Sequence, residues 1–400
     1  MNQKRSTGSG LILRQLSCFA LIFALLVLVS CSDTRTVSEL SRYGTYGSDF
    51  AERLASTYPA RAAGTASEAA SAGLIRQEFE KMGYVPEVRS FTLPEGGRSA
   101  NIVVRIPGSG FVARSENIEN LDYEIYNRRA KAEYGLFGRQ VIVGARYDTD
   151  PAAPEDADGI SDNASGVGAL LTLAQQLKRH SVGYDIVLIA FGGSFSDLAG
   201  ARSYVDAMDR AEKERTDCFY EFRSLYSGGK LYANAGWSSL YPDYKYSLRQ
   251  PLYEIADIAL RESTASRAGE TLFQNQATFL IPNPLAEEPL PSGFKAPPEQ
   301  VVFREISATV SDYRAFDSAL IPCVLMESFE FSAASFDELK ENVDPNYAST
   351  NYRVRGTGFD NSESLKSFSD DELLTTRINV SAFLVFKAIE NGVLGGLNHR

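Results

Sequence analysis

Hydrophobic and polar positions alternate along the 400-residue chain in blocks that predict helices and strands in turn. Between Ser165 and Lys178 apolar residues recur every three or four positions, which is typical of an amphipathic helix packed on a sheet. The apolar runs Gln140–Gly144 and Asp185–Phe191 are typical of strands that a parallel sheet buries on both faces. The same criteria predict further helices at 48–56, 66–82, 198–208, 252–261 and 371–390, and further strands at 84–91, 101–106 and 321–326.

This order predicts an α/β fold in which a mostly parallel central sheet is flanked by helices on both faces. We expect one domain over residues 48–392, after a polar tether at 31–47 and before a polar tail at 393–400. Two stretches interrupt the alternation and are expected to be insertions, near 111–138 and near 218–300. The second is rich in tyrosine between Cys218 and Tyr246, which indicates either a packed cap or an aromatic wall over a cleft.

The N-terminus has the pattern of a bacterial lipoprotein signal peptide over residues 1–30. Basic residues precede an apolar run from Leu16 to Val29, which is too short for a stable membrane span. The run ends in Leu28-Val29-Ser30-Cys31, which resembles the lipobox and implies that Cys31 becomes the lipidated first residue. The alternative is an uncleaved anchor helix. In both cases we expect an extracytoplasmic domain in the bacterial cell envelope, anchored to a membrane.

The chain is acidic, and cleavage makes it more so. Residues 1–30 carry three positive and no negative charges, so their removal changes the formal charge from −11 to −14. An acidic surface argues against nucleic acid as a partner, because nucleic-acid binding depends on basic patches. The expected partners are the membrane, through the lipid on Cys31, and a peptide or protein ligand.

Two cysteines, Cys218 and Cys323, remain once Cys18 is cleaved off and Cys31 is lipidated. A disulfide between them is permitted outside the cytoplasm. Cys323 nevertheless lies in the apolar run Leu320–Met326, where a buried free thiol is common, so we favour two core thiols over a bridge.

The most informative motif consists of Val141–Asp148 followed by Gly159–Gly166. Together with Tyr58–Gly64, Asn101–Gly108 and Ser311–Pro322, these residues resemble the zinc aminopeptidases of metallopeptidase family 28, whose relatives include glutaminyl cyclase and the transferrin receptor ectodomain. The resemblance covers most of the mature chain. It implies a peptidase-like domain of zinc-exopeptidase (phosphorylase/hydrolase-like) architecture.

The resemblance also implies a site for two zinc ions, held by two histidines and three carboxylates, with a further glutamate as general base. In this chain most of those roles fall on other residue types. Arg146 and Tyr313 stand at the histidine positions, Ser194 stands at the general base and Phe195 at the next ligand. Asp162 alone retains a ligand, the bridging carboxylate.

These replacements predict that no zinc is bound and that no cofactor is needed. Arginine does not ligate zinc because its guanidinium group stays protonated, and phenylalanine has no donor atom. The chain's two histidines do not restore the site, because His180 ends a predicted helix and His399 lies in the tail. The remaining carboxylate ligand is expected after Val205, near Asn234.

The replacements have a positive role in the charge balance of the remnant pocket. Without zinc, Asp148, Asp162 and Asp312 form a cluster that lacks a counter-charge, which is costly in a buried site. Arg146 supplies a permanent positive charge there, so we expect it to pair with Asp162 or Asp312.

Three hypotheses for function remain. The preferred one is a catalytically inactive lipoprotein, a pseudoenzyme whose cleft acts in peptide or protein binding or in assembly, because the losses fall on the chemically required positions. The second is an active metal-dependent aminopeptidase or other peptide hydrolase with a non-standard site, such as calcium on the acidic run Asp156–Asp162. A nucleophilic Ser194 is a weaker version of it, because no histidine is available as a base. The third is a purely structural envelope component.

Overall fold

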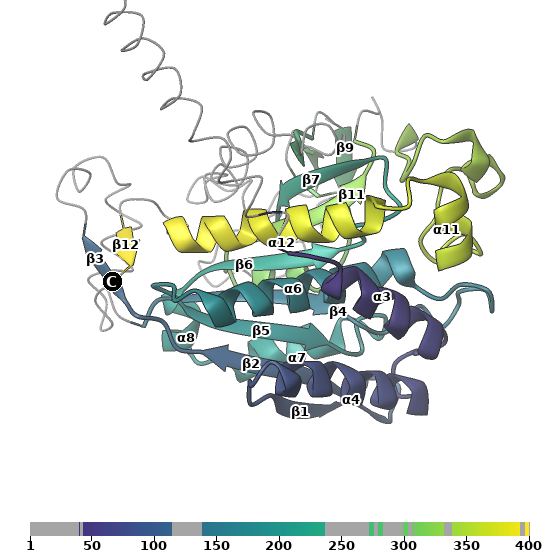
Figure 1. Ribbon diagram of the computed structural model, residues 1–400. Coiled ribbons are helices and arrows are strands. Elements are labelled where there is room, and N and C mark those ends of the chain that lie inside the picture. The colour runs from purple at the N-terminus through teal and green to yellow at the C-terminus, as the bar shows by residue number, and fades with distance from the viewer. Residues whose placement is uncertain are drawn as a thin grey trace, which may run out of the picture.

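An eight-stranded mixed sheet lies at the centre of the computed structural model (Figure 1). The structure describes residues 40, 43–113, 138–236, 272–275, 279–282, 299–302, 306–307, 309–331, 338–392 and 397–399. In spatial order the strands are β1 (Glu87–Thr92), β2 (Arg98–Ile106), β5 (Asp185–Phe191), β4 (Gln140–Arg146), β6 (Thr216–Arg223), β11 (Cys323–Phe329), β7 (Lys230–Ala235) and β8 (Leu272–Phe273).

The central strands run parallel and the flanking strands include antiparallel pairs. β4 pairs in parallel with β5 and β6, β6 with β11, and β7 with β8. β1 with β2, β2 with β5, and β7 with β11 are antiparallel. The prediction of a mostly parallel sheet is therefore confirmed. The parallel register also brings the carboxyl ends of β4, β5 and β6 to one edge of the sheet.

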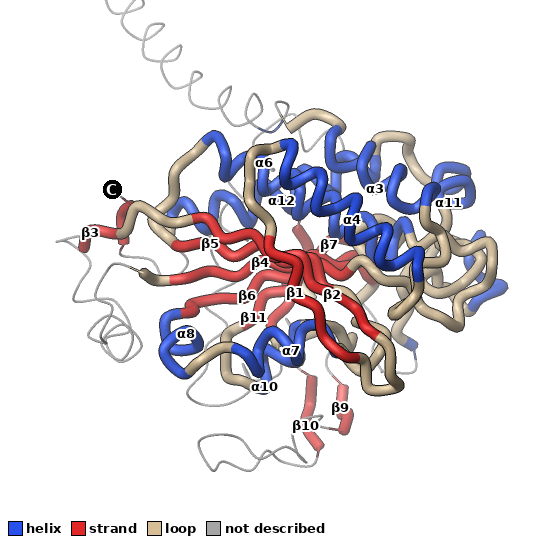
Figure 2. The backbone as a smooth tube through the Cα atoms, turned by 90° about the horizontal axis from the view of Figure 1, so that it is seen from below, coloured by secondary structure: helices blue, strands red, loops and turns tan. Residues whose placement is uncertain are grey.

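Helices cover both faces of the sheet, as expected (Figure 2). One face carries α3 (Tyr46–Thr57), α4 (Ala66–Lys81), α6 (Ser165–Arg179) and α12 (Leu373–Asn391). The other carries α7 (Ala199–Ala207), α8 (Arg210–Arg215) and α10 (Tyr313–Ser318). The shorter elements are α11 (Ser362–Phe368), a 3₁₀ turn at Pro345–Thr350, and the two-stranded pairs β9 (Phe279–Pro282) with β10 (Glu299–Val302) and β3 (Phe111–Ala113) with β12 (Leu397–His399).

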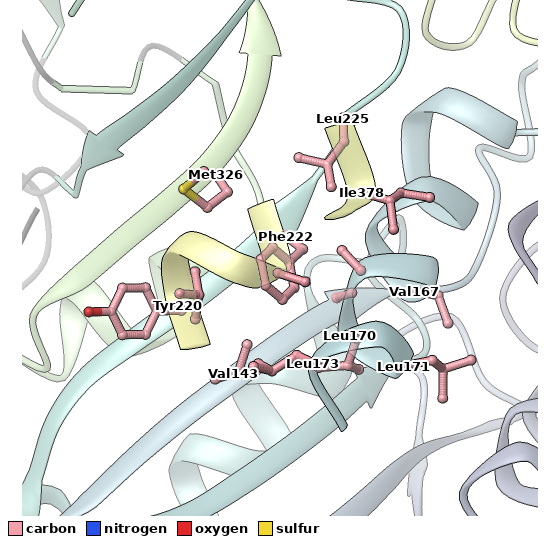
Figure 3. Packing of buried hydrophobic residues seen from close by; sticks show 14 of the residues in the cluster. Val143, Val167, Leu170, Leu171, Leu173, Tyr220, Phe222, Leu225, Met326 and Ile378 are labelled. Carbon is pink, nitrogen blue, oxygen red and sulfur yellow. The ribbon is translucent and has the colours of Figure 1, made fainter. Parts of the chain in front are cut away.

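Two hydrophobic cores lie on opposite faces of the sheet. On the α6 face, Val167 and Leu170 of α6 pack with Val143 and Phe222 of the sheet and Ile378 of α12 (Figure 3). Alternate residues of each strand supply the two cores: in β5, Ile186, Leu188 and Ala190 enter one cluster, and Val187, Ile189 and Phe191 enter the other. This double burial explains why the strand is apolar throughout.

Side chains cap the start of α4. The Thr65 hydroxyl oxygen accepts a hydrogen bond of 3.1 Å from the backbone N–H of Glu68. The Glu68 carboxylate in turn accepts from the backbone N–H of Gly64 at 2.7 Å. This reciprocal arrangement fixes the point at which the helix begins.

The structure corrects two boundaries. β6 and β7 belong to the central sheet, although residues from 218 onward were expected to begin an insertion. The apolar pattern of β6 is obscured by Asp217, Glu221 and Arg223, which are all buried. The expected tail contains β12, whose backbone pairs with β3. The predicted helix at 252–261, residues 1–39 with Cys31, and residues 114–137 of the first insertion lie outside the described residues.

Neither Cys218 nor Cys323 forms a disulfide, as favoured from the sequence. Cys218 and Cys323 lie on neighbouring strands, and both are buried. Cys218 enters the core on the α6 face and Cys323 enters the core on the other face. The sheet therefore separates the two sulfur atoms.

The described tyrosines of the aromatic stretch pack in the core. Tyr220, Tyr226 and Tyr232 are each no more than 2% exposed. They favour the packed interpretation for this part of the stretch, and residues 237–246 lie outside the described part. In the ranges that the structure covers, no helix combines the length and apolar character that crossing a membrane requires.

Candidate functional site

The site lies where β4 and β6 end. Arg146 is the last residue of β4, and Asp148 follows in the next loop. Arg223 is the last residue of β6. Glu221 lies two residues before it, on the same face of the strand. The parallel pairing sets Gly144 opposite Glu221, so the polar ends of both strands come together.

Asp162 reaches this edge from a π-helical turn, Ile160–Ala164, directly before α6. Single π turns inside helices are rare and recur at functional sites. Arg61, which is fully buried, holds the surrounding loops in place. Its guanidinium group donates to the backbone oxygens of Tyr147 and Asp158, both at 2.7 Å. This explains how the Tyr58–Gly64 segment supports the site.

Arg146 and Asp162 form a buried ion pair, which confirms the expected pairing. Arg146 Nη2 donates to Asp162 Oδ1. The guanidinium carbon lies 4.5 Å from the centre of the Phe195 ring, a cation–π contact. Burial alone would raise the pKa of Asp162, but the positive charges of Arg146, Arg223 and Arg355 lower it below its usual value. Asp162 is therefore ionised and compensated by arginine.

Asp148, Ser194 and Asp312 form the other half of the site. Asp148 Oδ2 accepts from the backbone N–H of Phe195 at 3.0 Å. Ser194 Oγ donates to Asp312 Oδ2 at 2.8 Å. Burial raises the pKa of Asp148 to about 7, and burial together with the charge of Glu221 raises the pKa of Asp312 to about 7. Each of these two carboxyl groups therefore changes between its protonated and its ionised form near neutral pH.

Tyr313 adjoins the site only through its backbone. Its N–H donates to Glu221 Oε2 at 2.8 Å, but its hydroxyl donates to the backbone oxygen of Thr309 at 3.1 Å. The ring lies in the core on the α10 face. The structure thus brings together the side chains of six of the seven residues singled out in the sequence: Arg146, Asp148, Asp162, Ser194, Phe195 and Asp312.

The expectation of a carboxylate ligand position near Asn234 is wrong. Asn234 lies on β7, beyond β11, and its amide donates to Glu327 at 2.8 Å. Glu221 of β6 is instead the additional buried carboxylate at the site, where it also accepts from Ser311 Oγ at 2.9 Å. The sequence contains one signal for this residue, because Glu221 directly follows the apolar run Cys218–Tyr220. That run lies in the stretch that is expected to be an insertion.

Two further arginines at the site were also missed. Arg223 is 7% exposed, and neither its Nε nor its Nη1 has a hydrogen-bond partner. Burial and the neighbouring charges of Arg146 and Arg355 lower the pKa of Arg223 to about 10. Arg355 Nε donates to Glu341 at 3.0 Å, and its Nη1 lies 3.5 Å from Ser224 Oγ. The site therefore holds three guanidinium groups.

Neither histidine reaches the site. His180 caps the end of α6 opposite to Asp162, and α6 is 15 residues long, which corresponds to about 22 Å. It is exposed and lies beside the Phe386 ring. The backbone of His399 pairs with Phe111 in the β3–β12 ribbon.

These residues do not fit a pair of zinc ions. Arg146 pairs with Asp162, the carboxylate at the bridging position. Phe195 supplies no donor atom, and the Tyr313 side chain points into the core. Throughout the described ranges, no group of three or more His, Cys, Asp or Glu residues is arranged to hold a metal. In the acidic run before α6, Asp158 uses both oxygens to accept from the backbone N–H groups of Ile160 and Ser362, at 2.9 and 3.2 Å.

Comparison with known proteins gives the same fold. A zinc aminopeptidase from Bacillus subtilis superposes with a TM-score of 0.55 at 14% identity, over 87% of this chain and 94% of the other. A glutaminyl cyclase from an Acidobacteriales bacterium superposes with a TM-score of 0.54 at 14% identity, over 88% and 96% of the two chains.

Sequence relatives are similar over shorter lengths. The Escherichia coli "Alkaline phosphatase isozyme conversion protein" is 30% identical over 209 residues, which are 48% of this chain and 54% of that protein. The Mycobacterium tuberculosis protein named "Probable lipoprotein aminopeptidase LpqL" is 31% identical over 129 residues, which are 28% of this chain and 25% of that protein. The chain thus spans about half or less of the length of these relatives. The family model for peptidase family M28 matches residues 128–353, and with more than half of its residues matched, the chain belongs to that family.

Proposed function

We propose that this protein is a catalytically inactive member of the family, a membrane-anchored extracytoplasmic lipoprotein that binds peptides or proteins. The observation that carries the proposal is the ion pair between Arg146 and Asp162. The guanidinium group pairs with Asp162, which stands at the position of the family's bridging carboxylate. A cation fixed to the chain compensates the Asp162 carboxylate, so zinc is not needed to balance its charge.

The position of the general base supports the same conclusion. Ser194 stands there, and its hydroxyl donates to Asp312. A hydroxyl group has no affinity for a proton near neutral pH, so it cannot deprotonate a water molecule. Asp312 has the raised pKa of a group that could accept a proton, but the described part of the chain offers no metal ligand set that would position a water molecule beside it.

The lipoprotein assignment rests on the N-terminal sequence and on one relative. The lipobox-like run before Cys31 follows a basic and then an apolar segment. The M. tuberculosis relative carries the word lipoprotein in its name. Both support an anchor on Cys31 and a location in the cell envelope.

The competing hypothesis is an active aminopeptidase with a non-standard site, and the names of the relatives favour it. One experiment separates the two. The full chain is purified in detergent, incubated with zinc, dialysed, and analysed for bound metal and for hydrolysis of a panel of amino-acid anilides. The B. subtilis aminopeptidase YwaD serves as the positive control.

We expect less than stoichiometric zinc and no turnover above the uncatalysed rate. Zinc near one or two equivalents, together with chelator-sensitive turnover, would overturn the proposal.

A further inference from the structure

The arginine cluster contains hydrogen-bond donors that have no acceptor among the residues that the structure describes. Within the described ranges, the donors Arg223 Nε, Arg223 Nη1 and Arg146 Nε are buried without a partner, and so are the acceptors Asp148 Oδ1 and Glu221 Oε1. Burying a polar group without a partner is unfavourable, and more so if the group is charged. A fold that keeps three such donors at one place indicates a ligand that accepts from them.

The charge around Arg223 points to an anion. The pKa of Arg223 is lowered first by burial and then by the positive charges of Arg146 and Arg355, and the carboxylates Asp162 and Glu221 only partly offset these effects. The acidic partners of the other two arginines are already engaged, since Arg146 pairs with Asp162 and Arg355 with Glu341. Arg223 is thus the guanidinium group with no ion pair of its own among the three.

We propose that Arg146 and Arg223 bind a carboxylate group, the free C-terminal carboxylate of a bound peptide. This inference rests on the proposed function and names the chemical group that the site recognises. A former cation site has thereby become an anion site.

A monoanion suits the site better than a phosphate. The buried carboxyl groups Asp148, Asp162, Glu221 and Asp312 surround the arginines. A dianion would meet more repulsion from these groups than a carboxylate would. Arg146 and Arg223 are 4% and 7% exposed and Phe195 is partly exposed, so the cluster lies close to the surface.

The test compares two probes on the full chain in detergent by isothermal titration calorimetry. The first is an N-acetylated alanine tripeptide with a free C-terminal carboxylate, and the second is the same peptide as a C-terminal amide. We expect the acid to bind roughly tenfold or more tightly than the amide, as expected for the loss of a charge-assisted hydrogen bond. Inorganic phosphate at the same concentration is expected not to displace the acid.

Two variants identify the arginine responsible. Arg223→Met should weaken binding of the acid roughly tenfold or more and leave binding of the amide unchanged. Because Arg223 carries an unpaired buried charge, the same substitution should raise the melting temperature of the ligand-free protein. The control Arg210→Met removes an arginine whose side chain is 91% exposed, and it should change neither quantity.

Equal binding of acid and amide, an unchanged affinity in Arg223→Met, or tighter binding of phosphate would each overturn the carboxylate site. None of these results bears on the absence of turnover. Conversely, zinc-dependent hydrolysis would overturn the proposed function whatever the peptides show.

Discussion

The individual charges of the site determine how it responds to pH. Folding buries several ionisable side chains at one edge of the sheet. The arginine charges compensate the negative charge of only some of the buried carboxyl groups. Asp162 is stabilised in its ionised form, whereas Asp148 and Asp312 hold protons up to about pH 7. Two kinds of carboxyl group thus lie side by side in the same cluster.

The raised pKa values of Asp148 and Asp312 predict that the protein loses stability as the pH rises. In the unfolded chain an aspartate has a pKa of about 3.9. Between about pH 4 and pH 7 the folded state therefore binds protons that the unfolded state releases. This contribution is fully present below pH 4 and is lost as the pH rises through about 7. The pKa of Asp162 is lowered in the folded protein, so Asp162 makes the protein less stable as the pH falls. This effect is confined to the range below about pH 4.

Urea unfolding measured at pH 5.5 and pH 8 checks this prediction. We expect the free energy of unfolding to fall by at least about 1 kcal/mol across this interval. Asp148→Asn combined with Asp312→Asn should make the fall smaller, because the amides keep the acceptor oxygens but do not titrate. Asp371→Asn, at an exposed position, should leave the fall unchanged. An equally steep fall in the double variant would contradict the assignment.

Among the helices, the crossing of α3 and α6 depends on a pair of glycines. A Cβ atom added at Gly168 would lie 2.5 Å from the backbone oxygen of Gly47, and one added at Gly47 would lie 2.6 Å from the oxygen of Gly168. Ile378 of α12 packs beside the same contact, with its side chain 2.8–2.9 Å from either added atom. The two helices approach this closely only because neither residue has a side chain.

Gly168→Ala should therefore destabilise the protein by about 1–3 kcal/mol, because the added methyl group meets backbone rather than a movable side chain. Gly73→Ala is the matched control, since Gly73 lies in α4 and an added Cβ there has no neighbour within 4 Å. It should stabilise by about 0.5–1 kcal/mol, because alanine favours the helix. Urea unfolding of both variants gives the signs, and the same sign for both would refute the account.

The elements also show which strands the sequence could reveal. β5 was predicted with its observed bounds, because apolar side chains fill both of its faces. β6 was overlooked because Asp217 pairs with the buried Arg139, and Glu221 and Arg223 lie in the site. Charged residues in a central strand hide its pattern, although here they mark its functional end.

For the molecule as a whole, the anchor is the main untested expectation. We predict that Cys31 carries lipid and is the first residue of the mature protein. Cells expressing the protein and grown with labelled palmitate should yield a labelled band that lacks residues 1–30. Cys31→Ser should abolish the label and leave the longer precursor, because the modified thiol is gone.

Cys18→Ser, within the proposed signal peptide, is the control and should be labelled and processed normally. Recovery of the unchanged chain with its first 30 residues attached would instead support an uncleaved anchor helix.

The sequence by itself determined the α/β alternation, the family framework and the identity of the replaced ligands, because each depends on local periodicity or on a short motif. The tertiary structure decided which charges meet. Arg146, Glu221, Asp312 and Arg355 come from distant parts of the chain, and only the sheet and its loops bring them to one edge. The sequence could therefore predict that Arg146 needs a carboxylate. Only the fold shows that Asp162 satisfies it and that two nitrogens of the nearby Arg223 have no acceptor in the described part of the chain.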